Sequence, residues 1–178
     1  MKVKNLLISK AKNQFLFQGK RKILDFSLSS GALILGHSNK VFCKSLKSQI
    51  NKGSNYSNRN LNEINYLKVL KKTFSEFDNF IFSNSGSEAN IRALRIARAI
   101  TKKDKFAIVN GSWHGSVDNF MFDFKNGDKI FPNNIQSLSS GIEYTKKNII
   151  VLPYNNISLT KKILDKNSKK ISVIVIEP

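Results

Sequence analysis

Residues 79–100 read NFIFSNSGSEANIRALRIARAI, and this stretch decides the fold of the chain. The apolar run at 79–83 predicts a short strand, and the polar turn at 84–87 ends it. The residues from about Glu88 to Ile100 predict a helix. A strand that passes through a tight turn into a helix is the first half of a β-α-β unit.

The same alternation continues toward the C-terminus. Strands are predicted at 105–109, 148–152 and 171–178, and a helix is predicted at 158–166, between the last two strands. Short strands that are almost continuously apolar are typical of a parallel sheet covered by helices on both faces. We therefore predict an α/β fold with a mostly parallel sheet, in which ligands bind at the carboxyl ends of the strands.

The first sixty residues are more mixed. They predict a short strand, a loop and an amphipathic segment, at 23–28, 31–36 and 41–50 respectively. A run of turn-forming residues at 53–60 follows, and from Leu61 to Phe74 apolar residues recur at the spacing of a helix with one buried face. We therefore expect an N-terminal segment at 1–60 and a larger unit at 61–178.

The charge of the chain is strongly basic. Its 178 residues carry a formal net charge of +18, and most of the basic residues are lysines spread along the chain in short pairs. A nucleic-acid interface would more often concentrate its charge and use arginine forks. We therefore expect a solvated lysine-rich surface and no nucleic-acid partner, and a basic binding protein is the alternative that the charge alone supports.

Cysteine content and hydropathy indicate the compartment. The single cysteine, Cys43, excludes an internal disulfide and fits a reducing compartment. No apolar stretch approaches the roughly 20 residues that cross a bilayer, and the first residues lack the features of a signal peptide. We expect a cytoplasmic protein with no membrane partner and no metal site.

The turn that contains Ser85, Gly86 and Ser87 is the first candidate site. It follows a predicted strand and opens a predicted helix, so its backbone N–H groups and the helix dipole favour a phosphate. Gly86 would let the backbone approach closely, and both serine hydroxyls can donate. Ser85 and Glu88 also have the spacing of a capping box, and this structural interpretation is the stronger one for the turn alone.

Two further loops end predicted strands. Trp113 could stack on a planar ring and His114 could donate a hydrogen bond, but a tryptophan that packs the sheet edge beside a satisfied histidine is the commoner arrangement. Glu177 ends an apolar strand, where a carboxylate needs a cation, a hydrogen-bond network or a cleft. For Glu177 the functional and structural interpretations have equal weight.

Five segments of the chain, taken in sequence order, resemble the class III aminotransferases, which use pyridoxal phosphate. Residues 82–99 resemble the family's N-S-G-T-E-A turn and following helix, and residues 104–115 resemble its next strand and Y-H-G loop. Residues 151–156 and 175–178 match the next two family segments. Residues 31–37, Gly-Ala-Leu-Ile-Leu-Gly-His, resemble the G-P-L-I-L-G-H segment of the glutamate-1-semialdehyde aminomutases in particular.

The resemblance implies the aspartate-aminotransferase-like fold, fold type I, and pyridoxal 5′-phosphate as cofactor. Its site residues carry over by position. The phosphate would be held by Gly86 and Ser87 with Ser85 beside them. The ring would stack on Trp113, which replaces the usual tyrosine, with His114 next to it and Glu177 nearby at the strand end.

The resemblance also implies a reaction, namely transfer or migration of an amino group on a small aldehyde or keto substrate, in a homodimer. The family's Schiff-base lysine and its ring-binding aspartate lie downstream of the matched segments, so no catalytic residue is assigned in this chain. We therefore expect the N-terminal portion of a longer enzyme, with an incomplete large domain that is inactive and binds the cofactor weakly when alone.

A few positions depart from the aminomutase pattern. Ser30 replaces an aromatic residue, Ala32 and Lys40 replace prolines, and residues 120–144 differ in composition from the loop that aminomutases carry over their site. Transamination and aminomutation therefore both stay open. A non-catalytic remnant that packs against a partner chain is a further alternative.

Overall fold

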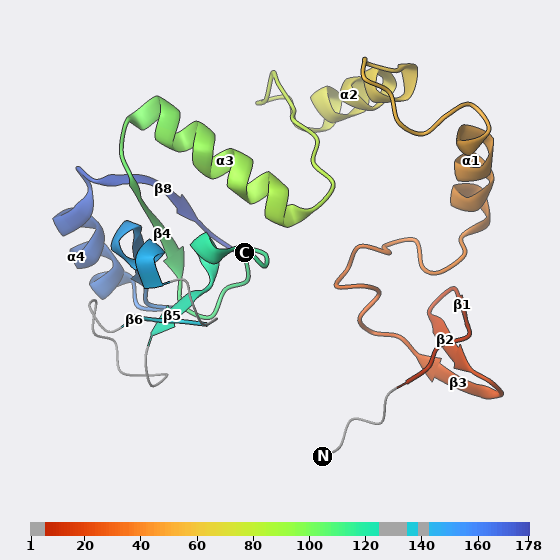
Figure 1. Cartoon of the computed structure of the whole chain (residues 1–178), viewed down its shortest axis with the longest axis horizontal. Helices are drawn as coiled ribbons and strands as arrows, with labels where there is room; N and C mark the ends of the chain where they lie inside the picture. Colours follow the sequence, from red (N-terminus) through yellow and green to blue (C-terminus); the bar gives the residue numbers. More distant parts are fainter. Residues whose placement is uncertain (1–5, 125–134, 139–142) are drawn as a thin grey trace. The chain divides into compact units, whose positions relative to one another are not determined.

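A computed structural model describes residues 6–124, 135–138 and 143–178 of the chain. Contacts along the chain divide it into two compact units, Met1–Phe77 and Asp78–Pro178, which are described separately below. Figure 1 shows the helices and strands of both units. The sequence predicts a different division, into an N-terminal segment at 1–60 and part of a cofactor-binding domain at 61–178. That division describes functional domains and not contacts, so it stays a prediction.

The first unit combines a small antiparallel sheet with two helices. Its elements, in chain order, are β1 (Lys10–Lys12), β2 (Phe15–Gln18), β3 (Arg21–Leu24), α1 (Lys40–Ile50) and α2 (Leu61–Thr73). The strand order is β1-β2-β3. The amide oxygens of Asn39 and Asn60 cap the two helices. The segment predicted as amphipathic at 41–50 is helical, and the helix predicted at 61–74 is confirmed. None of the described residues of this unit is buried.

The strand predicted at 23–28 is wrong beyond Leu24, because Asp25 turns the chain there. Its carboxylate accepts hydrogen bonds from the backbone N–H groups of Ser27 and Leu28, at 2.9 and 3.1 Å. Its second oxygen lies 2.8 Å from Nε2 of His37, and this hydrogen bond lowers the pKa of Asp25. Local hydrogen bonds of this kind compete with a strand ladder.

The second unit is an α/β layer built on a parallel sheet. Its elements are α3 (Gly86–Thr101), β4 (Lys105–Val109), η1 (Asp118–Phe120), β5 (Phe122–Phe124), β6 (Ile135–Ser137), η2 (Glu143–Asn148), β7 (Ile149–Leu152), α4 (Ile157–Asn167) and β8 (Ile171–Val175). In the described chain the parallel sheet has the order β7-β4-β8, and β5 pairs with β6 in an antiparallel ribbon. The predicted α/β class and its last three strands and two helices are confirmed.

The strand predicted at 79–83 is wrong. These residues have the apolar composition of a strand, but they pair with no other strand in the described part of the chain. A strand exists only where a neighbouring backbone accepts its hydrogen bonds, and local apolar composition does not supply that neighbour.

The core of the second unit lies on both faces of β4, as a sheet covered on both sides requires. On one face Phe106 and Ile108 pack with Leu94 of α3 and with the three phenylalanines of η1 and β5. On the other face Ala107 packs with Leu152 and with Ile163 of α4. The β5–β6 ribbon, which the sequence did not predict, therefore completes the core.

In the part of the chain that the structure describes, no helix is long and apolar enough to cross a membrane.

The Phe106 ring tests this core. It is 1% exposed and meets the Phe120 ring edge-on, with centroids 5.6 Å apart. Phe106→Ala should lower the free energy of unfolding of the second unit by about 3–5 kcal/mol, because it leaves a cavity in a close-packed interior. Urea unfolding measures the loss. The control Ile100→Ala, at a side chain that is 76% exposed, should change it by less than about 0.5 kcal/mol, and losses of equal size would contradict the assigned core.

Candidate functional site

The turn before α3 is both a helix cap and an open surface. Oγ of Ser85 accepts a hydrogen bond from the N–H of Glu88 at 3.2 Å, and the Glu88 carboxylate accepts one from the N–H of Asn84 at 3.0 Å. The first N–H groups of a helix have no intrahelical acceptor, and within the described chain those of Gly86 and Ser87 find none elsewhere. A side chain added at Gly86 would meet nothing within 4 Å. In the described chain these two backbone donors therefore have no protein acceptor, and the position beside Gly86 is open.

Gly115 brings the neighbouring loop against this turn. Its φ is +101°, and a Cβ atom there would lie 2.9 Å from Cα of Ser87 and would overlap the Ser87 hydroxyl. Only glycine combines this backbone conformation with so close an approach. The loop at 111–115 and the first turn of α3 are therefore in direct contact.

Trp113 lies on the same loop with its side chain outward. Its backbone N–H donates to Oε2 of Glu177 at 2.8 Å, and the residue is 59% exposed. Glu177 lies two residues after the end of β8, so this hydrogen bond joins the segments that follow β4 and β8. The two predicted site residues are thus neighbours, and the indole ring is available to a ligand.

His114 lies inside the protein instead. It is 5% exposed, its ring meets the Phe120 ring edge-on, and its Nε2 lies 3.0 Å from Oγ of Ser112. The Ser112 hydroxyl donates its single proton to the carbonyl of Val109, so the contact with His114 requires a proton on Nε2. Burial lowers the pKa of His114, while the negative charge of Glu177 acts in the opposite direction. The imidazole is therefore neutral at pH 7 and supports the loop from within.

Asn90 is the contact that sequence reasoning missed. Its Nδ2 donates to the carbonyl of His114 at 2.9 Å and ties α3 to the loop. Asn90 lies three residues after Ser87, so both side chains lie on one helix face, and this spacing is the signal that could have identified it. Together these contacts bring Ser87, Trp113, His114 and Glu177 into one neighbourhood, with Ser85 and Gly86 at its edge.

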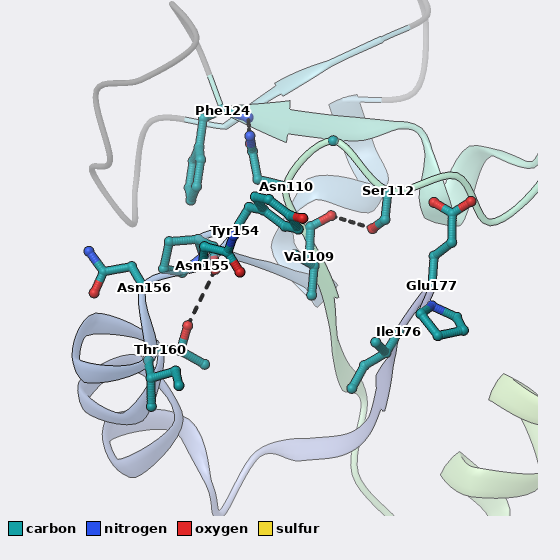
Figure 2. Close-up of a pocket in the computed structure, with 14 residues that line it drawn as sticks. Val109, Asn110, Ser112, Phe124, Tyr154, Asn155, Asn156, Thr160, Ile176 and Glu177 are labelled. Carbon is teal, nitrogen blue, oxygen red and sulfur yellow. Dashed lines mark hydrogen bonds between the residues drawn. The ribbon is translucent and has the colours of Figure 1, made fainter.

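A hollow of about 890 Å³ opens at the carboxyl ends of β4, β7 and β8 (Figure 2). Of the six predicted site residues only Glu177 lines it. Tyr154 and Phe124 contribute aromatic surface, and Glu177 stands at the opposite side (Figure 2). Ser85, Gly86, Ser87 and Trp113 do not line it. The turn before α3 and the hollow are therefore separate features, and Glu177 connects them because it lines the hollow and accepts the hydrogen bond from Trp113.

The approach of Gly115 to Ser87 can be measured with a matched pair of variants. Gly111→Ala places a methyl group in open space at a φ of +79°, so it should cost only the left-handed strain, about 1–2 kcal/mol. Gly115→Ala adds steric overlap with Ser87 to similar strain and should cost about 1–3 kcal/mol more in urea unfolding. Equal losses in the two variants would show that the loop does not rest on α3.

The buried His114 ring predicts a pH dependence. Because its pKa in the folded chain is below the ordinary value of 6.5, the unfolded chain binds a proton more readily. The stability of the second unit should therefore be highest above pH 6.5 and fall as the pH is lowered through that value toward the lowered pKa. Urea unfolding between about pH 7.5 and about pH 5 measures this slope.

His114→Gln should flatten the slope, since glutamine keeps a donor for Ser112 but does not titrate. His37→Gln changes the other histidine of the chain, which belongs to the first unit, and should leave the slope of the second unit unchanged. A slope that survives in His114→Gln would show that another group binds the proton.

Curated sequence relatives align with most of the chain. A glutamate-1-semialdehyde 2,1-aminomutase of Thermodesulfovibrio yellowstonii is 36% identical over 97% of the chain. The enzyme of the same name from Nitrosopumilus maritimus is 35% identical over 89%. The chain spans about 40% of the length of the first relative and 37% of the second.

Solved structures share the fold. An omega-transaminase from Sphaerobacter thermophilus superposes with a TM-score of 0.86 at 24% identity, over 96% of this chain and 40% of that one. A glutamate-1-semialdehyde aminomutase from Pseudomonas aeruginosa gives 0.83 at 18% identity, over 97% and 37%. These similarities confirm the predicted fold type I architecture.

The family model described as "Aminotransferase class-III" matches residues 1–178. With the order of elements in the second unit and the turn before α3, this match assigns the chain: it belongs to the class III aminotransferase family.

Proposed function

We propose that the protein acts as, or as part of, a pyridoxal-phosphate-dependent aminotransferase or aminomutase. Its reaction would transfer or shift an amino group on a small aldehyde or keto substrate. The observation that carries the proposal is the pair of backbone N–H groups at Gly86 and Ser87, which have no acceptor in the described chain and lie beside the loop that bears Trp113.

The turn has the chemistry that a phosphate requires. Two N–H donors and the positive end of the α3 dipole favour an anion at this place. The hydroxyl of Ser85 accepts from Glu88 through a lone pair, so its proton stays available to a phosphate oxygen. Ser87 adds a second hydroxyl in place of the family's threonine. The residues present therefore fit the cofactor's phosphate group.

The neighbouring loop has the chemistry that an aromatic ring requires. Trp113 exposes its indole, and a flat electron-rich face stacks on a planar heterocycle. Glu177 accepts from the Trp113 backbone and holds that residue at the end of β8. When bound, pyridoxal phosphate supplies a ring that withdraws electrons from the substrate carbon. In this proposal the chain binds and orients that ring, and His114 supports the loop beneath it.

The substrate proposal rests on the relatives. Both quoted sequence relatives are named glutamate-1-semialdehyde 2,1-aminomutase, so we propose a small amino aldehyde of this kind as the first candidate. Ser30, Ala32 and Lys40 are the departures that would alter specificity. We further propose that the protein works as a homodimer in the cytoplasm, and that catalysis requires a Schiff-base lysine and a ring-binding aspartate, for which no residue among 1–178 is assigned.

Three small molecules test the phosphate cradle on the 178-residue chain. Pyridoxamine 5′-phosphate, which cannot form Schiff bases with surface lysines, should shift the amide resonances of Gly86 and Ser87 and quench the fluorescence of Trp113, the only tryptophan. Inorganic phosphate should shift the two amides without quenching Trp113. Pyridoxamine without its phosphate should do neither at the same concentration.

Matched serine variants sharpen this test. Ser87→Ala removes one donor to a charged group and should weaken binding of pyridoxamine 5′-phosphate by about tenfold. The control Ser45→Ala, at an exposed helical serine of the first unit, should bind like the unchanged chain. Resonance shifts confined to the hollow around Tyr154, with none at Gly86, would refute the proposed cradle.

A further inference from the structure

Asn90 connects two parts of the proposed site without belonging to either. It lies within α3, one turn after Ser87, and its side-chain amide donates to the carbonyl of His114 at 2.9 Å. Asparagine is a poorer helix former than alanine because its side chain competes for backbone hydrogen bonds. Its place inside a helix therefore indicates a role other than helix formation, and the contact with the loop supplies one.

Two contacts, one turn apart, set the position of the loop along α3. Gly115 rests on Ser87, and His114, the residue before it, receives the hydrogen bond from Asn90. Residues three apart on a helix lie on the same face, so the loop meets α3 at two successive points. A single contact would let the loop pivot, whereas two contacts fix its distance from the turn at Gly86.

Trp113 depends on such contacts because its ring is not packed. The residue is 59% exposed, and its described backbone hydrogen bond goes to a carboxylate that is itself exposed. His114, the next residue, is held by its buried ring and by Asn90. The backbone that carries the indole is therefore held by Glu177 at Trp113 itself and by the contacts of His114 on the C-terminal side, and Asn90 acts directly on the latter.

We propose that Asn90 is a positioning residue that holds Trp113 at the distance from the Gly86 turn at which one ligand can contact both. This inference rests on the proposed function for the identity of the ligand, a phosphorylated pyridine. The placement of Trp113 itself does not depend on that identity. Loss of the Asn90 donor should therefore loosen the Trp113 loop while it preserves α3.

Two variants separate the hydrogen bond from the helix. Asn90→Ala removes the donor and improves helix propensity, and Asn90→Asp keeps the shape but places a carboxylate against the His114 carbonyl. Arg95→Ala, at an exposed position of α3, is the control. The first readout is the time-resolved fluorescence anisotropy of Trp113 in the free chain, with helix content followed by circular dichroism.

Both Asn90 variants should show more fast depolarisation of Trp113 than the unchanged chain, with helix content preserved in Asn90→Ala. The Arg95→Ala variant should match the unchanged chain. The second readout is binding of pyridoxamine 5′-phosphate, which should weaken by about fivefold in Asn90→Ala, the change expected for one ordinary hydrogen bond. The shifts of Gly86 and Ser87 with inorganic phosphate should stay as in the unchanged chain.

The outcomes distinguish this inference from the proposed function. If the unchanged chain shows no response to pyridoxamine 5′-phosphate at Gly86 and Ser87, the proposed function fails, and the anisotropy alone decides the role of Asn90. If the unchanged chain responds but Trp113 is equally rigid in both Asn90 variants, the positioning role is overturned and the proposed function stands. Depolarisation that rises only with loss of helix content also overturns the positioning role.

Discussion

The contact between Gly115 and Ser87 is the constraint on which the candidate site depends. No side chain fits between the two backbones, so the loop after β4 and the first turn of α3 must lie together. From this contact follow the place of Trp113 beside the open N–H groups and the reach of Asn90 to the loop. The sheet makes the contact available, since the loop follows the carboxyl end of β4 and α3 packs on that strand through Leu94.

Much of the second unit could be predicted from its sequence because two strands of its parallel sheet, β4 and β7, are buried on both faces. Lys105–Val109 and Ile149–Leu152 are short apolar runs, and each has one face toward α3 or the β5–β6 ribbon and the other toward α4. Such runs contrast sharply with the polar turns that bound them. The turn at Ser85 was predictable for a similar local reason, because its capping residues and its glycine are adjacent in the chain.

What could not be predicted depends on partners that are distant in sequence. The run at 79–83 has strand composition but no neighbouring strand in the described chain, and β5 finds its partner only across residues 125–134, which lie outside the described residues. His114 was predicted beside a ligand, yet its ring packs on Phe120 and Ser112. That prediction of a cofactor contact stays untested, and local sequence does not show which way a loop side chain turns. The spacing from Ser87 to Asn90 marks a shared helix face, but the partner of Asn90, His114, is 24 residues away and no local pattern identifies it.

The Ser85 turn can act both as a helix cap and as a phosphate site, because the cap uses a lone pair of the Ser85 hydroxyl and a phosphate would use its proton. A cap needs one lone pair of the Ser85 oxygen, which accepts from Glu88, and a phosphate would need the proton that remains. The cap also satisfies one N–H group of the helix start and leaves those of Gly86 and Ser87 without an acceptor in the described chain. A better-capped helix therefore holds its free donors more rigidly, and rigid donors lose less entropy when an anion binds. In this turn the feature that argued for a plain helix cap also favours the phosphate site.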